Sequence, residues 1–178
     1  SFLRQQNEIN QDSTLFKVGL AYLQAGNNNY KEALLLLDSI SGVKTEFGNV
    51  SLIKGDILAK QGLMDKALDS YRIFLNEAPS NLKAVEKLVS AYERKGDLSA
   101  ALEVLNASIP KVNNNISLKL LKVSFESRLN RKIDKGILQE LKKHKATSDH
   151  WVLYETQGHI AFSQGNMADA VQFYQAAY

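Results

Sequence analysis

Apolar residues recur three and four positions apart through most of the chain, in short runs that end at glycine or proline. The clearest case lies between residues 49 and 81. One apolar stripe stops at Gly62, a second begins at Met64, and Pro79 closes the segment. This spacing places apolar side chains on one face of a helix. The segment therefore predicts two short amphipathic helices that are joined by a turn at Gly62.

The same two-helix pattern returns at a fixed interval. The separation between Gly62 and Gly96 equals the separation between Ala67 and Ala101. A fixed period of about 34 residues is typical of a stacked helical array. Because no single helix pair can bury its own apolar face, stability must come from contacts between neighbouring pairs. The predicted fold class is an all-α solenoid of ten helices in five antiparallel pairs, with no β-sheet.

The period divides the chain into five units. Residues 1–11 are interpreted as the tail of a preceding repeat or a linker, and residues 12–178 as the array, with units at 12–47, 48–81, 82–116, 117–150 and 151–178. The first turn, after Gly26, is predicted to be two residues longer than the next. The fourth unit is degenerate and fits only if one extra residue lies in the loop 113–115, which places Arg131 in its turn.

The fifth unit stops before its second helix is expected to end. We therefore expect the chain to be a segment of a longer array. We also expect exposed apolar surface near Tyr178 and self-association through the truncated ends.

Small residues recur where the two helices of a pair should touch, because only small side chains allow close approach. On the first helices these are Gly19, Gly55 and Gly158, and on the second helices they are Ala33, Ala67, Ala101 and Ala170. Bulky residues are expected to fill the space between one pair and the next; these are Tyr22, Tyr71, Tyr92 and Tyr174.

These positions resemble the tetratricopeptide repeat family, whose repeat combines a Leu-Gly-x2-Tyr element, an Ala-x3-Phe element and a closing proline. The second unit matches with Gly55, Ala67, Tyr71 and Pro79. The match extends over residues 12–178, with the weakest fit in the fourth unit. The resemblance implies a right-handed superhelix, from a larger bacterial protein, whose concave face is lined by the first helices and holds a peptide or a partner helix.

Alignment to the family predicts the residues of that concave, partner-binding face. They are Phe16, Leu20, Leu52, Asp56, Lys83, Lys87, Arg94, Phe125, Arg128 and His159. One subset of the family clamps a C-terminal carboxylate with five polar residues from three successive repeats. Lys83 and Lys87 match two of those positions in type, but apolar residues occupy the others, so a carboxylate clamp is not expected.

Charge changes this picture in one segment. The chain carries a net charge of +3, and residues 111–146 hold ten Lys or Arg residues against three acidic ones. This basic fourth unit is most simply a solvated face. An acidic protein, an anionic polymer or a lipid surface is the alternative partner.

No catalytic motif is present in the sequence, and its carboxylates are isolated from one another. The three histidines, His144, His150 and His159, lack the spacing of a shared metal site. We therefore predict no enzyme activity, no metal and no cofactor. No apolar run is long enough to span a bilayer, no signal peptide is recognisable, and the absence of cysteine leaves the compartment, cytoplasmic or periplasmic, undecided.

The leading functional hypothesis is a non-catalytic scaffold that binds a protein or peptide of unknown identity in the concave groove. One alternative is a structural segment of a long tetratricopeptide lipoprotein in a bacterial envelope or export system. The other is polyanion binding through the basic fourth unit, although nucleic acid is a disfavoured partner because no base-stacking platform is evident.

Overall fold

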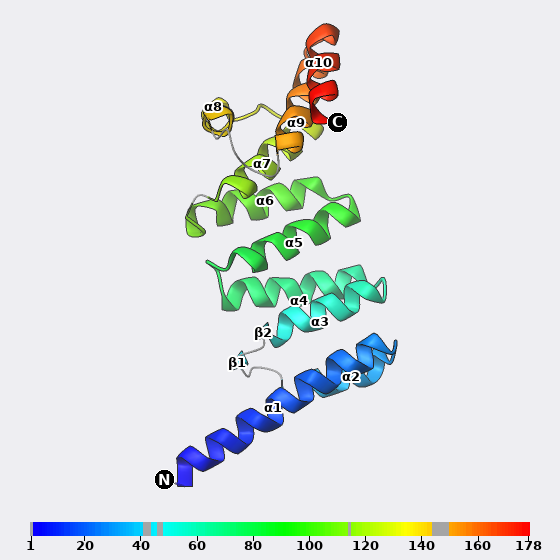
Figure 1. Ribbon diagram of the computed structural model, residues 1–178, viewed down its shortest axis with the longest axis vertical. Helices are drawn as coiled ribbons and strands as arrows, with labels where there is room; N and C mark the ends of the chain where they lie inside the picture. Colours follow the sequence, from blue (N-terminus) through cyan, green and yellow to red (C-terminus); the bar gives the residue numbers. More distant parts are fainter. Residues whose placement is uncertain (1, 41–43, 46–47, 114, 144–149) are drawn as a thin grey trace. The chain divides into compact units, whose positions relative to one another are not determined.

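The computed structural model describes residues 2–40, 44–45, 48–113, 115–143 and 150–178 (Figure 1). These residues form two compact units, 1–91 and 92–178. The described helices are α1 (Phe2–Gly26), α2 (Tyr30–Asp38), α3 (Val50–Lys60), α4 (Met64–Glu77), α5 (Leu82–Lys95), α6 (Leu98–Ser108), α7 (Ile116–Arg128), α8 (Lys135–Lys143), α9 (His150–Ser163) and α10 (Met167–Ala177), with a 3-10 turn at Ile109–Lys111.

The first unit contains α1 to α4 and the beginning of α5. Helix α1 lies against α2, and α3 lies against α4 (Figure 1). One core joins the first pair to α3 through Val18, Ala21, Ala25, Ala33, Leu37, Ile40, Val50, Ile53 and Ile57. Successive helix pairs therefore share one apolar core, as the period predicts.

A small β-ribbon precedes α3, and it corrects the prediction that the chain has no sheet. Strands β1 (Lys44–Thr45) and β2 (Gly48–Asn49) pair in antiparallel fashion. Asn49 then caps α3, since its side-chain oxygen accepts a hydrogen bond from the Ser51 amide at 2.8 Å. Two residues per strand leave no alternating pattern that sequence analysis could detect.

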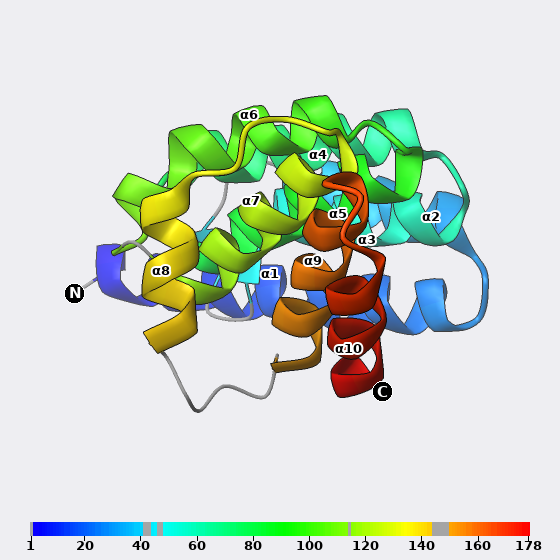
Figure 2. The same ribbon diagram turned by 90° about the horizontal axis from the view of Figure 1, so that it is seen from above.

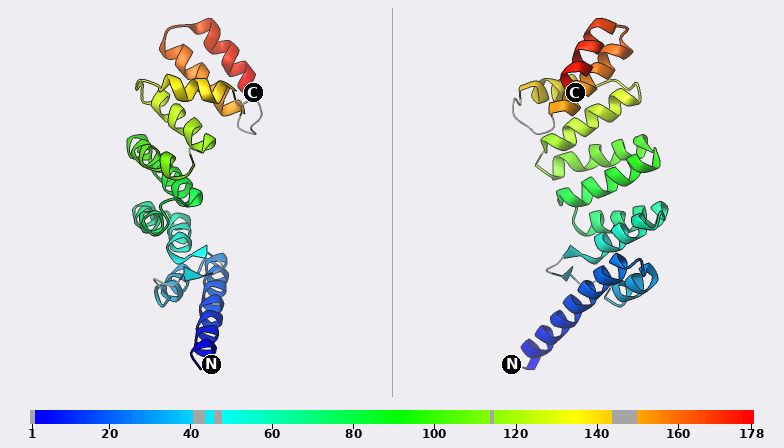
Figure 3. Two further views of the ribbon diagram at one scale, coloured as in Figure 1. Left: turned by 90° about the vertical axis from the view of Figure 1, so that its left-hand side faces the viewer. Right: turned by 45° about the vertical axis from the view of Figure 1, so that its right-hand side comes forward.

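Helix α1 is longer than the sequence pattern indicates. It begins at Phe2 and runs without interruption to Gly26 (Figure 3), so most of the predicted tail, residues 2–11, is continuous with the first helix of the array. This stretch includes neither glycine nor proline, and Leu, Arg, Gln and Glu within it are good helix formers.

Left-handed residues between the helices of each pair fix the register of the repeats. Five such residues have a positive φ, which is costly for most side chains: Asn28 (64°), Gly62 (78°), Gly96 (82°), Asn130 (51°) and Gly165 (77°). The first four follow one another at equal intervals along the chain, and the last interval is longer by a single position.

This register corrects three expectations. The first turn has no extra residues, because Asn28 is the equivalent of Gly62. Asn130, and not Arg131, takes the glycine position of the fourth unit. The single extra residue lies after Asn130, and not in the loop 113–115. Asparagine tolerates this conformation because its short side chain can hydrogen-bond locally.

The same register moves the first close contact. Ala21, which is fully buried, is the equivalent of Gly55. Gly19 is exposed, and a Cβ atom added there would meet nothing within 4 Å, so its assignment as a contact residue is wrong. Tyr22 is 52% exposed and does not fill space between pairs. The small residues of the second helices are where they were predicted, since Ala33, Ala67, Ala101 and Ala170 are all at most 2% exposed.

The second unit contains the irregular fourth pair. In the other pairs the second helix begins two residues after the left-handed residue, as Met64 follows Gly62. After Asn130, residues 131–134 are not helical and α8 begins only at Lys135. The Asp134 carboxylate accepts hydrogen bonds from the Gly136 and Ile137 amides at the start of α8. In this unit α7 packs directly on α9, and α9 lies beside α10 (Figure 2).

Candidate functional site

A polar cluster in the first unit joins side chains from three successive first helices. The Oδ1 atom of Asp56 on α3 accepts hydrogen bonds from the Tyr71 hydroxyl at 2.7 Å and from Nζ of Lys87 on α5 at 2.8 Å. Tyr22 on α1 lies one repeat period before Asp56 and so occupies the same repeat position. Partial burial and the charge of Asp56 raise the pKa of Tyr22, while Lys87 lowers it by a smaller amount. We call Tyr22, Asp56, Tyr71 and Lys87 the Asp56 cluster.

Gly55 allows Tyr71 to reach this cluster from the second helix. A Cβ atom at position 55 would lie 2.6 Å from Cδ1 of Tyr71 and closer still to Cε1. The Tyr71 ring therefore crosses α3 over Gly55, the residue of this helix that has no side chain. The hydroxyl emerges on the far side of α3, beside Asp56.

The fifth pair repeats this arrangement. A Cβ atom at Gly158 would lie 2.7 Å from Cε1 of Tyr174, and the Tyr174 hydroxyl lies 3.1 Å from Nδ1 of His159. The two rings meet edge to face with their centroids 5.5 Å apart. Glu155 lies one helical turn before His159, with Oε1 3.9 Å from Nε2. Sequence analysis missed this function of the tyrosines, although the glycine and the tyrosine have the same separation in both pairs.

The predicted partner-binding residues of the first unit differ in exposure. Phe16 is 71% exposed, Lys83 is exposed, and Leu20 is half-buried. Asp56 and Lys87 are half-buried and bonded to each other. Leu52 is only 7% exposed, so its side chain belongs to the packing of the pair. The corrected register replaces Leu20 by Tyr22 as the neighbour of Asp56 in the repeat pattern.

In the second unit, Phe125 is 1% exposed and its side chain is enclosed by the protein. The corrected register moves the equivalent of Asp56 by one residue, from Phe125 to Ser124. Arg128 bonds to Glu93 at 2.6 Å, and its guanidinium lies 5.5 Å from the centroid of the Phe125 ring. Arg94 is exposed and His159 is half-buried.

Internal partners compensate several charges of the basic segment 111–146. Lys119 bonds to Glu140 at 2.7 Å, and Lys122 lies 3.8 Å from Glu126. Arg131 donates a hydrogen bond to the Ser99 hydroxyl at 3.2 Å. The side chains of Lys142, Lys143 and Lys145 lie outside the described residues. Within the described part of the segment, Lys119, Lys122 and Arg128 are ion-paired, whereas Lys111, Arg131 and Lys132 are exposed.

Within the part of the chain that the structure describes, no group of three or more His, Cys, Asp and Glu side chains could hold a metal ion. His144 and the His150 side chain lie outside that part. None of the helices that the structure describes is both long and apolar enough to cross a membrane.

Several solved structures share this fold. A MamA structure (MSR-1) superposes with a TM-score of 0.60 over 92% of this chain and 94% of its own, at 15% identity. YrrB, described as a tetratricopeptide protein with an unusual peptide-binding site, has a TM-score of 0.65 over 99% of this chain and 90% of its own, also at 15% identity. A tetratricopeptide protein from Parabacteroides merdae has a TM-score of 0.63 at 20% identity, over 92% of this chain and 63% of its own.

A comparison with curated protein sequences gives no match. The sequence profile of the tetratricopeptide repeat matches residues 18–81 and, in a second overlapping match, residues 52–116. Together these matches cover more than half of the chain, and the similar structures have the same stacked helix pairs. The predicted all-α solenoid is therefore confirmed, and the chain belongs to the tetratricopeptide repeat family.

Proposed function

We propose that the chain is a non-catalytic scaffold that binds a protein or peptide segment on the face of the first helices in the first unit, around the Asp56 cluster. The observation that carries this proposal is the position of Tyr22, an aromatic side chain that is 52% exposed in the repeat position of Asp56. Exposed tyrosines beside polar groups are enriched where proteins bind one another. YrrB, which has the same fold, is described as having a peptide-binding site.

The cluster also indicates what kind of segment it suits. Lys87 is already paired with Asp56, so its charge is not available to anchor a C-terminal carboxylate. Both hydrogen bonds that Asp56 accepts within the described part of the chain end on Oδ1, which leaves Oδ2 for a donor from a partner. An internal stretch of peptide supplies such a donor from a backbone amide or a lysine, and Tyr22 offers an apolar ring for packing beside it.

Site-specific photo-crosslinking tests the proposal. A photoreactive phenylalanine analogue is placed at Tyr22 in one variant and at Ile73 in another. Ile73 is 51% exposed, lies in the same unit and belongs to a second helix, α4, so it matches Tyr22 in accessibility but not in face. We expect crosslinks to a protein partner from position 22 and not from position 73, and we expect Asp56→Ala to reduce their yield.

Equal crosslinking from both positions would overturn the assignment of this face. A salt titration separates the proposal from polyanion binding through residues 111–146. Polyanion binding weakens steeply with ionic strength because it releases counterions, whereas a contact centred on Tyr22 is expected to change little. A role as a structural segment alone predicts no crosslinked partner at position 22.

A further inference from the structure

The irregular fourth pair leaves a cavity in the second unit. In the other pairs the second helix begins two residues after the left-handed residue. Here the corresponding stretch is the non-helical segment 131–134, and α8 begins three residues late. A cavity of about 480 Å³ lies where the first turn of the second helix would be, between the end of α7, the start of α8 and α9.

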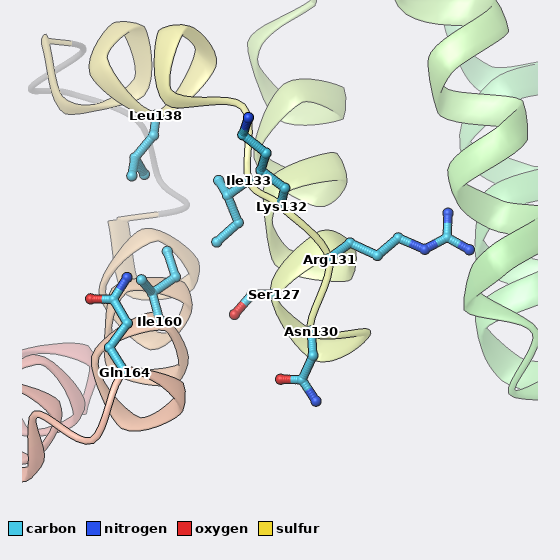
Figure 4. Close-up of a pocket in the computed structure, with 8 residues that line it drawn as sticks. All are labelled: Ser127, Asn130, Arg131, Lys132, Ile133, Leu138, Ile160 and Gln164. Atoms are coloured by element: carbon cyan, nitrogen blue, oxygen red, sulfur yellow. The ribbon is translucent and has the colours of Figure 1, made fainter.

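The cavity has an apolar part and a polar part (Figure 4). Its apolar lining comes from Ile133, Leu138 and Ile160, and its polar lining from Ser127, Asn130, Arg131, Lys132 and Gln164. Ile160 occupies the repeat position of Ile57, which is 3% exposed in the regular second pair. Ile160 remains partly exposed. The missing helical turn thus uncovers apolar surface that the regular pairs bury.

One buried polar atom in the lining has no partner. Ser127 is 7% exposed, and its Oγ atom makes no hydrogen bond to any described residue. Figure 4 shows this hydroxyl directed into the space between α7 and α9. Leaving a buried hydroxyl unbonded costs free energy, so its presence needs an explanation. A ligand that accepts a hydrogen bond from Ser127 supplies one.

The charge of the lining favours an anion. The residues that line the cavity include two cations, Arg131 and Lys132, and no acidic residue. The Arg131 side chain is directed away from the cavity and bonds to Ser99 on α6 (Figure 4). Its guanidinium therefore does not contact a bound group, but its positive charge raises the electrostatic potential of the cavity. Lys132 is an exposed residue of the lining, and Figure 4 shows its amine directed toward the start of α8 and away from Ser127, so it meets a bound group by a change of rotamer. Two carboxylates adjoin the lining in sequence, and both have partners. Asp134 caps α8, and Glu126 accepts a hydrogen bond from the Asp134 amide and lies 3.8 Å from Lys122.

We propose that this cavity is a binding site for a small monocarboxylate with a short apolar body. The apolar body would contact Ile133, Leu138 and Ile160. The carboxylate would accept hydrogen bonds from Ser127 and from Lys132. Volumes of this size are typical of small-molecule sites, and the combination of an apolar wall with a few polar groups is their usual composition.

Methyl NMR of the whole chain tests the site with three probes that share one carbon skeleton. These are 4-methylpentanoate, the neutral 4-methylpentanamide and the cationic 4-methylpentan-1-amine. We expect 4-methylpentanoate to shift the methyl signals of Ile133, Leu138 and Ile160 with one saturating dissociation constant. The amide should bind at least about tenfold more weakly and the amine should give no saturation, because a charge-assisted hydrogen bond stabilises the bound carboxylate.

Two variants and one matched control locate the binding groups. Lys132→Glu should weaken 4-methylpentanoate binding by about tenfold or more, and Ser127→Ala by about threefold to tenfold. Lys111→Glu makes the same charge change in the same basic segment, at an exposed position outside the cavity, and should leave binding unchanged. Lys132 is exposed, so its replacement is not expected to disturb folding.

Three results would overturn the proposal. The first is the absence of saturable shifts at the three methyl groups up to about 10 mM probe, which corresponds to a negligible affinity. The second is equal binding of the carboxylate and the amine. The third is an equal loss of affinity in Lys132→Glu and Lys111→Glu, which would assign the effect to the general charge of the segment.

Discussion

Replacing Gly55 by alanine tests whether a tyrosine ring truly occupies the space beside this glycine. The substitution has two opposing effects on the free energy of unfolding. Alanine is favoured over glycine inside a helix by about 1 kcal/mol. The new methyl group, however, would stand 2.6 Å from Cδ1 of Tyr71, a residue that is 3% exposed and bonded to Asp56. Overpacking of this kind costs about 1 to 3 kcal/mol.

Gly19→Ala provides the matched control. Gly19 also lies inside a helix, but an added Cβ atom there meets nothing within 4 Å. We therefore expect Gly19→Ala to raise the free energy of unfolding by about 0.5 to 1 kcal/mol. Gly55→Ala should fall below that control by the whole overpacking cost, about 1 to 3 kcal/mol. Urea denaturation followed by far-UV circular dichroism measures both.

A double-mutant cycle identifies the cause. In the first pair, Ala21 and Leu37 occupy the positions of Gly55 and Tyr71, and both are fully buried. In a Tyr71→Leu background, Gly55→Ala should therefore become neutral or favourable, with a coupling energy of about 1 to 3 kcal/mol. The reasoning is refuted if Gly55→Ala and Gly19→Ala change stability equally, or if the coupling energy is near zero.

Three further predictions concern the turn, the cluster and association. Asn130→Gly should raise the free energy of unfolding by up to about 1 kcal/mol, because glycine carries no penalty at a φ of 51°; a melting curve unchanged or lowered would contradict the register. Tyr22 should titrate above pH 10.0, so stability from its protonated form falls once the pH passes that value, and Asp56→Asn should lower its pKa in an ultraviolet titration. Copies of the chain should associate through the apolar surface near Tyr178, where Val171 is 54% and Tyr178 is 96% exposed, and serine at both should shift sedimentation toward the monomer, whereas a wild-type monomer at all concentrations would exclude this.

Most of the fold could be predicted from the sequence because the residues at the key repeat positions, glycine and alanine, each have one main structural role there. Glycine marks the turns at Gly62, Gly96 and Gly165, and all three have positive φ. Alanine marks the close contacts of the second helices, and Ala67 and Ala101 are fully buried. Glycine is required by the positive φ of the turns and alanine by the close approach of the helices, so both can be recognised in a single sequence.

The errors arose where asparagine takes the place of glycine. Asn28 and Asn130 adopt the left-handed conformation, but asparagine also serves in caps and loops, so its role is ambiguous in sequence. The register consequently slipped by two residues in α1 and by one in α7. Those slips selected Leu20 and the buried Phe125 for the partner face in place of Tyr22 and Ser124.

The apolar period could not predict that the Tyr71 hydroxyl crosses α3 to reach Asp56. Helical spacing indicates the face on which a residue lies, and it does not indicate how far the side chain extends. The late start of α8 is weakly indicated in the sequence by Asp134, because aspartate is a favourable residue at a helix N-cap. A search for a second capping residue after the turn would have found it.

The direct contact between α7 and α9 affects how this unit transmits cooperativity. In a linear array each element is stabilised by its neighbours, and the loss of one element normally separates those on either side. Because α7 touches α9 without α8 between them, the path of stabilising contacts from α6 to α10 does not run through α8. Helix α8 still contributes Leu141, which is 4% exposed, to the core with Leu120, Val123 and Leu153. An exposed position of α8 such as Gln139 can therefore change without affecting the contact between α7 and α9, whereas a polar residue at position 141 would open the core that these helices share.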